Sequence, residues 1–219
     1  MVEEDKIENS IMPIGSTGLY RVEKSLEITN RILNEHKIRL LQEAIPTIKL
    51  GRQEWMIKNL DVDCYSNGDP ITHVPNIKEW KNLTKGAWCY YDNKIENKFK
   101  YGRIYNWYAI ADVRNICPNG FRVPNEQDWL EFIAFLGGRE NAYAFLFTNH
   151  KSNFKLHLGG YINNGLFCEE GESCFFWSLS KFNNGDDCKT WNYGGGIFNE
   201  ICTFDDEKNQ GFYLILIKN

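Results

Sequence analysis

Every tryptophan, phenylalanine and cysteine of this chain lies after Pro46, so the sequence falls into two unlike parts. The 219 residues include 7 Trp, 11 Tyr and 14 Phe, and aromatic residues make up 15% of the chain. So much large apolar surface excludes a disordered chain, and the length is sufficient to bury it in a core. We therefore predict an N-terminal segment at residues 1–46 and one folded domain at residues 47–219.

The segment before Pro46 carries a helical pattern from Leu19 onward. Its apolar residues recur near the three-to-four spacing of one helical face. A lone helix of this size is marginal in water, so this face needs a cover: the main domain, a second copy or a partner protein. All three covers stay open, and the residues expected to dock the helix are Leu19, Val22, Leu26, Leu33 and Leu40.

After Pro46 the pattern changes to short runs typical of β-strands, separated by Gly, Asn and Asp. The predicted strands are residues 54–57, 87–91, 155–162, 174–179, 188–193, 200–204 and 211–218. Helical signals occur at residues 104–111 and 125–136. The second helix has Asn125 as N-cap, an acidic residue three positions later, and Gly137-Gly138 as its end. The sequence therefore predicts an α+β fold.

Charge and hydropathy exclude two classes of partner. The net charge is −4, from 25 basic and 29 acidic residues without a long basic run, so we expect no nucleic-acid partner. No apolar stretch reaches the roughly 18 residues of a membrane span. The acidic start, Met1 to Lys6, lacks the features of a secretory signal, so we expect a cytoplasmic protein. Export or a cell-surface location is the alternative if a signal was removed.

The sequence offers no constellation typical of an enzyme. The seven cysteines form no CxxC pair, so reduced and mostly buried thiols are expected, with up to three disulfides if the protein is exported. The four histidines are scattered, and none pairs with a Ser or Cys nucleophile in a motif. We therefore predict no catalytic residue, no metal site and no cofactor.

Three stretches carry a family resemblance: QEWMIKNLDV at 53–62, YGRIYNWYA at 101–109, and CPNGFRVP at 117–124 with Trp129. In order and spacing they resemble the Fibrobacter succinogenes major paralogous domain, a family common in Bacteroidetes and related bacteria and without an assigned activity. The closing strands at 176–178 and 211–214 are also similar, so the resemblance covers about residues 48–219.

Residues 120–129 are also similar to a block of the formylglycine-generating enzymes, whose fold is related to that of C-type lectins. The resemblance implies a C-type-lectin-like fold, with two helices beside a small twisted antiparallel sheet and a long irregular loop region. Copper chemistry of that enzyme class would need a cysteine pair, with Cys168 and Cys174 or Cys188 and Cys202 as candidates. A lectin calcium site would need an Asp that residues 191–193 lack, and residues 205–207 are expected in a solvated turn.

Aromatic residues near Asn and Asp in the C-terminal strands suit sugar stacking or a protein hot spot, although a core role for most of them is the alternative. In C-type-lectin-like folds this region forms the binding face. The residues we expect to bind a ligand are Trp177, Trp191, Asn192, Tyr193, Phe198 and Phe204.

These features favour a non-enzymatic recognition module. It would bind a protein or a glycan through the C-terminal aromatic face, and the N-terminal helix would dock to a partner or to a second copy. Three alternatives stay open: a variable binding protein of the diversity-generating retroelement type, an oxidase related to formylglycine generation, and a structural or assembly protein.

Overall fold

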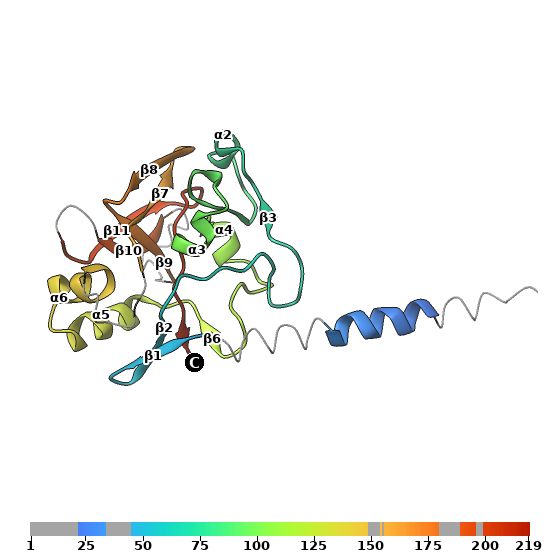
Figure 1. Cartoon of the computed structure of the whole chain (residues 1–219), viewed down its shortest axis with the longest axis horizontal. Helices are drawn as coiled ribbons and strands as arrows, with labels where there is room; N and C mark the ends of the chain where they lie inside the picture. Colours follow the sequence, from blue (N-terminus) through green and yellow to red (C-terminus); the bar gives the residue numbers. More distant parts are fainter. Residues whose placement is uncertain (1–21, 34–44, 149–153, 155, 180–188, 196–198) are drawn as a thin grey trace, which may run out of the picture. The chain divides into compact units, whose positions relative to one another are not determined.

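The computed structural model describes residues 22–33, 45–148, 154, 156–179, 189–195 and 199–219, and only the backbone of 189–195 and 204–206. The chain divides into two compact units, Met1–Ala44 and Ile45–Asn219. In the first unit a helix spans residues 22–33, drawn in blue in Figure 1. Within the described ranges, no helix has both the length and the apolar character that a membrane crossing requires.

The second unit contains three small sheets (Figure 1). One has the order β1-β2-β12-β6, built from Thr47–Leu50, Gln53–Met56, Ile217–Lys218 and Phe121–Arg122. Another has the order β11-β10-β9-β7-β8, built from Cys202–Glu207, Lys189–Gly195, Cys174–Ser178, Gly159–Asn163 and Leu166–Glu170. The third joins β3 (Thr72–His73), β4 (Ala87–Cys89) and β5 (Ile104–Tyr105). Their pairings are antiparallel except for β3 with β4 and β7 with β9.

Short helices connect these strands. They are α2 (Ile77–Trp80), α3 (Asn97–Tyr101), α4 (Trp107–Ile110), α5 (Glu126–Phe135) and α6 (Arg139–Tyr143), with a 3-10 turn at Tyr91–Asn93 and a π-helical turn at Ala144–Thr148. The predicted α+β class is confirmed. The expectation of two helices is wrong for the second unit. Among its described residues, the segments that connect the strands form the short helices α2, α3, α4 and α6, each of five residues or fewer, in addition to the longer α5.

Of the two helices expected from the sequence, the structure confirms α5. The side chain of Asn125 accepts from the amide of Asp128, whose carboxylate accepts from the amide of Asn125, so both halves of the capping box form. At the other end, Gly138 N donates to Ile133 O and Gly137 N donates to Ala134 O. This pair of bonds is a Schellman motif, which needs the positive φ that glycine supplies at position 137.

The strand predictions hold for β2, β4, β9, β10 and β11, and the predicted strand at 155–162 overlaps β7 from Gly159 onward. Residues 104–111 form β5 and then α4 instead of one helix, and β8 was not predicted. Residues 205–207 lie in β11, not in a turn. Of the predicted strand at 211–218, Ile217–Lys218 alone is a regular strand. Because a run that is apolar at every position has no solvent-facing side, its backbone can hydrogen-bond to several neighbouring segments in succession instead of forming one long strand.

The segment from Gly211 to Ile217 runs through the core and joins the sheets. Single bridges pair Phe212 with Tyr105, Gly211 with Ile162 and Tyr213 with Phe176. Farther along, the Leu214 and Leu216 carbonyls accept from the amides of residues 60 and 56. All seven residues of the segment are buried. The rings of Trp55, Trp129 and Phe132 extend this core toward α5, with centroids 5.0 to 5.8 Å apart.

A buried arginine ties the loop before β3 to the third sheet. The guanidinium of Arg103 donates to the carboxylates of Asp61 and Asp63, and its Cζ lies 4.1 Å from the ring centroid of Trp88. The Arg103 side chain is 6% exposed. Arginine suits this position because one planar group can pair with two carboxylates and stack on an indole at once.

Candidate functional site

Trp177 was expected on the binding face, and the structure shows that this expectation is wrong. The residue is fully buried in β9, and its Nε1 donates a 2.7 Å hydrogen bond to the Tyr105 carbonyl. Its ring lies 4.5 Å from that of Phe212 and 5.5 Å from that of Trp107. A ring enclosed in this way has no face for a ligand, because burial of its large apolar surface stabilises the core instead.

The remaining expected ligand residues lie on or near the last two strands of the five-stranded sheet. Asn192 on β10 stands opposite both Trp177 and Phe204, and Trp191 stands opposite Ser178 and Asp205. The backbone therefore brings Trp191, Asn192, Tyr193 and Phe204 into one region of the sheet. Their side chains, and all of Phe198, lie outside the described residues, so their role in binding stays a prediction.

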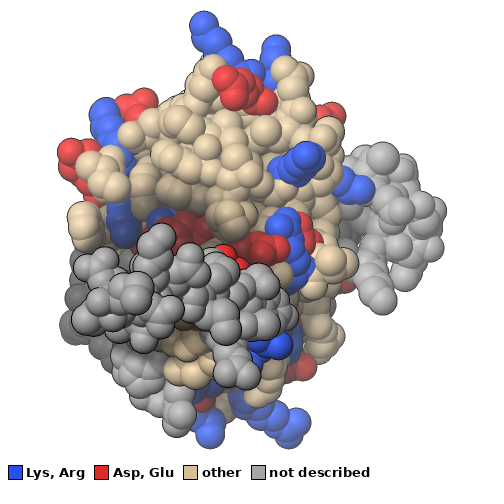
Figure 2. Space-filling model, turned by 90° about the vertical axis from the view of Figure 1, so that its right-hand side faces the viewer, with Lys and Arg blue, Asp and Glu red and all other residues tan. Residues whose placement is uncertain are grey.

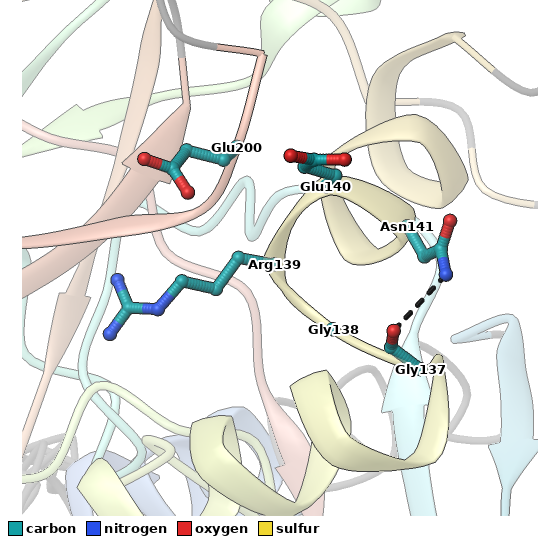
Figure 3. A pocket seen from close by; sticks show the side chains of 6 residues that line it. All are labelled: Gly137, Gly138, Arg139, Glu140, Asn141 and Glu200. Carbon is teal, nitrogen blue, oxygen red and sulfur yellow. Dashed lines mark hydrogen bonds between the residues drawn. The ribbon is translucent and has the colours of Figure 1, made fainter.

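A polar pocket opens at the start of β11, and we call it the Glu200 pocket. Its volume is about 290 Å³, and it lies between the turn that joins α5 to α6 and the residues before β11 (Figure 3). It is lined by Gly137, Gly138, Arg139, Glu140, Asn141 and Glu200. The pocket thus adjoins the strand that carries Phe204.

Hydrogen bonds on both sides hold the walls of the Glu200 pocket in place. Arg139 extends toward the strand (Figure 3), where its Nη1 donates to the Ile201 carbonyl at 3.0 Å. In return the Ile201 amide donates to the Arg139 carbonyl at 3.2 Å. On the helical side, the Asn141 side chain donates to the Gly137 carbonyl at 3.2 Å. The α5–α6 turn and the start of β11 therefore form one connected wall.

The lining of the Glu200 pocket suits recognition of a ligand rich in hydrogen-bond donors. Glu140 and Glu200 contribute carboxylates, and Asn141 contributes an amide. Gly137-Gly138 was expected only as a helix end, and this pocket was not predicted from the sequence. The local signal was present in the polar residues 139–141 directly after the two glycines, but their pairing with Glu200 depends on the sheet.

The cysteines with a resolved pKa shift show no activated thiol. Burial raises the pKa of Cys117 and of Cys174 to about 12. The pKa of Cys202, beside the pocket, is also raised, by burial first and then by the Glu200 carboxylate. Cys89, Cys117, Cys168, Cys174 and Cys202 are free thiols, and Cys188 is outside the described residues. A thiol kept protonated at neutral pH is a poor nucleophile and a poor metal ligand.

Neither the histidines nor the acidic residues assemble a metal site in the part of the chain that the structure describes. His73 stacks on Trp88 with ring centroids 4.1 Å apart, and its pKa is lowered by burial first and then by Arg103. His157 meets Tyr101 edge-on at 6.2 Å. In the view of Figure 2, basic and acidic side chains are interspersed, and that face shows no broad basic surface.

Within its own unit, the helix at 22–33 leaves apolar side chains uncovered. Val22 is 66% exposed, Leu26 62% and Leu33 60%, and Ile28 and Ile32 widen the stripe. Leu19 and Leu40, which were expected to continue the docking face, lie outside the described residues. The helix and its apolar face were thus predicted correctly over the described range.

Comparison with known proteins adds one match. Residues 48–213 match the model of the Fibrobacter succinogenes major domain, over most of the second unit. No curated protein and no solved structure matches the chain. The match spans the three sequence stretches that carried the resemblance, together with the Glu200 pocket and strands β7 to β11. The chain belongs to the Fibrobacter succinogenes major domain family.

Proposed function

We propose that this protein is a non-enzymatic recognition module that binds a protein or a glycan through its C-terminal strands β10 and β11 and the adjoining Glu200 pocket. One observation carries the proposal: a polar pocket stands at the start of β11, the strand that carries Phe204 and pairs along its backbone with Asn192 and Tyr193 of β10. Pockets that combine a few fixed polar groups with nearby aromatic surface are typical of ligand sites. A C-type-lectin-like architecture of the second unit forms part of this proposal.

The position of β11 in its sheet supports the same reading. β11 is at the end of the strand order, and within the described residues it pairs with β10 alone. An edge strand offers unpaired backbone donors and acceptors to an incoming peptide, whereas a pocket with carboxylates suits the hydroxyls of a sugar or a basic side chain. A protein and a glycan ligand would therefore use different parts of one surface.

The test compares single substitutions in the full chain on a glycan array and in a crosslinking capture from cell lysate. Glu200→Gln and Trp191→Ala are expected to lower the binding of the captured ligand at least about tenfold, the loss typical of a hot-spot residue. Glu126→Gln, an exposed change in the first turn of α5, is the matched control. Equal binding by all variants would overturn the proposed face, and capture on the array would identify a glycan.

The exposed stripe on the helix at 22–33 supports docking of this helix to a partner or to a second copy. Isolated apolar residues are ordinary on surfaces, but a stripe along a helix this short gains stability only when it is covered. The double variant Leu26→Glu/Leu33→Glu is expected to reduce the mass measured by light scattering, or to abolish capture of a partner. Lys24→Ala on the same helix is the control, and an unchanged mass together with unchanged capture would remove the docking role.

A further inference from the structure

A second and larger cavity, of about 540 Å³, lies outside the proposed face. It is formed by three stretches of the chain: residues 65–72, residues 84–86, and residues 108–114 from the end of α4 onward. We call it the Tyr65 cavity. Its volume falls within the range of about 300 to 1,000 Å³ that is usual for small-molecule sites.

The wall at residues 85–87 is fixed by Asn106, which is fully buried. The Asn106 Oδ1 accepts from the amide of Ala87 at 2.9 Å and from that of Ala109 at 3.1 Å. Its Nδ2 donates to the Lys85 carbonyl at 2.8 Å. One side chain thus caps α4 and fixes residues 85–87 at the start of β4, so this wall of the cavity is preformed.

Arg114 lines the cavity, and most of its N–H donors already form hydrogen bonds within the protein. Its Nε and Nη2 donate to the two carboxylate oxygens of Asp112 at 2.9 and 2.8 Å, and its Nη1 donates to Asp69 at 3.2 Å. The guanidinium also lies over the Tyr65 ring, with Cζ 4.1 Å from the centroid. The planar fork that would hold a phosphate in two places is therefore occupied by Asp112.

The hydroxyl of Tyr65 forms part of the cavity wall. It is buried and lies against Gly86, where an added Cβ would come within 2.1 Å of it. Burial, and then the Asp112 carboxylate, raise the pKa of Tyr65 to about 12, so the phenol keeps its proton. Because this hydroxyl is enclosed, the exposed groups of the lining are the ones that a ligand can reach.

Lys85 supplies the positive charge of the cavity. It is exposed, and no ion pair with another described residue is found for it. Thr72 and Thr84 add exposed hydroxyls, and Tyr108 adds a half-buried ring at the rim. The lining therefore combines one unpaired cation with several neutral donors and one aromatic surface.

We infer that the Tyr65 cavity binds a hydroxylated monocarboxylate, such as one uronic acid unit of a polysaccharide. Lys85 would pair with the carboxylate, the exposed hydroxyls of Thr72 and Thr84 would bond to ligand oxygens, and Tyr108 would cover a sugar face. A doubly charged phosphate fits less well, because a single lysine faces it and the arginine is neutralised by two carboxylates.

The test is an NMR titration of the full chain with D-glucuronate, D-glucose and glucose 6-phosphate. Glucuronate is expected to give saturable shifts at Tyr65 and Gly86 and to bind at least about tenfold more tightly than glucose, since a charged hydrogen bond is lost with the neutral sugar. Added salt should weaken glucuronate binding. Lys85→Met should weaken it about tenfold, whereas Lys78→Met, an exposed change on α2 outside the cavity, should leave it unchanged.

A Thr84→Val variant separates the cavity from the fold. It removes only one exposed hydroxyl of the lining, so the chain should stay folded while glucuronate binds about threefold or more weakly. Equal affinities for glucose and glucuronate would overturn the charge selection. Tighter binding of glucose 6-phosphate would make this a phosphate site, and the absence of saturable binding by glucuronate would overturn the site itself.

Discussion

The indole Nε1 of Trp177 donates to the backbone carbonyl of Tyr105, a residue 72 positions earlier in the chain, at a distance of 2.7 Å. Because both groups are buried, the bond joins the five-stranded sheet to the three-stranded one through the core. Trp177 thus acts as a structural tie between the sheets.

Replacing Trp177 by Ala should destabilise the protein by about 3 to 5 kcal/mol, because the change leaves a cavity and an unpaired carbonyl. Urea unfolding followed by circular dichroism measures this free energy. Phe99→Ala, at a position that is 87% exposed, should change it by less than about 0.5 kcal/mol. Similar losses in the two variants would contradict the structural role of Trp177.

Replacing Arg103 by Met should destabilise the domain by about 3 kcal/mol. The aliphatic part of the side chain is kept, but Asp61 loses its nearest counter-charge while it stays partly buried. Arg103→Lys should recover only part of the loss, since an ammonium cannot pair with both carboxylates and stack on Trp88. If Arg103→Lys unfolded with the free energy of the wild type in the same urea experiment, the positive charge alone would account for the stabilisation by Arg103.

Acidification should weaken the contribution of Asp112. Hydrogen bonds from Arg114, above all, lower the pKa of Asp112 from 3.8 to about 2. A lowered carboxylate pKa stabilises the fold above pH 4, and this contribution is lost as the pH falls toward 2. Since solvent screens part of the interaction, we expect about 1 kcal/mol. The difference in unfolding free energy between the wild type and Asp112→Asn should therefore disappear as the pH falls from about 5 to about 2.

The pH series needs a reference, which Asp92→Asn provides at an exposed position. A gap between wild type and Asp112→Asn that stays constant over the whole series would argue against the ion pair as its source.

Replacing Gly86 by Ala should cost about 1 to 3 kcal/mol through overpacking. The new Cβ would lie 2.1 Å from the Tyr65 hydroxyl and 3.0 Å from the Ala109 Cα. In a Tyr65→Phe background the first clash is relieved, so the same substitution should cost less, and thermal unfolding of the four proteins gives the coupling energy. Identical costs in both backgrounds would mean that the hydroxyl does not limit the space at Gly86.

Local signals in the sequence were sufficient for some elements and not for others. The start of α5 could be predicted, since Asn125 and Asp128 form its capping box within four consecutive residues. The segment at 211–217 could not, because an apolar run is compatible with any buried conformation and its partners lie on three sheets. The class of fold follows from periodicity, whereas the joining of the sheets depends on contacts distant in sequence.

The same reason explains the candidate sites. Trp177 has the residue type and neighbourhood of a stacking platform, and only its packing shows that it belongs to the core. The Tyr65 cavity combines three separate stretches, none of which carries a motif of its own. Glu200 lies beside residues 137–141 at the point where Arg139 and Ile201 bond to each other. The strands β10 and β11 could thus be predicted from the sequence, but no wall of either pocket could.

The path of residues 211–217 also sets the order in which this domain can assemble. Trp55 pairs with Ile217, and the amides of Met56 and Leu60 donate to the carbonyls of Leu216 and Leu214. On the ribosome these partners emerge after the rest of the second unit, so β1 and β2 spend most of its synthesis with an open edge and uncovered aromatic rings. Contacts so far apart in the chain slow folding and prolong exposure to aggregation. The nascent domain should therefore depend on chaperones until its final strand has been made.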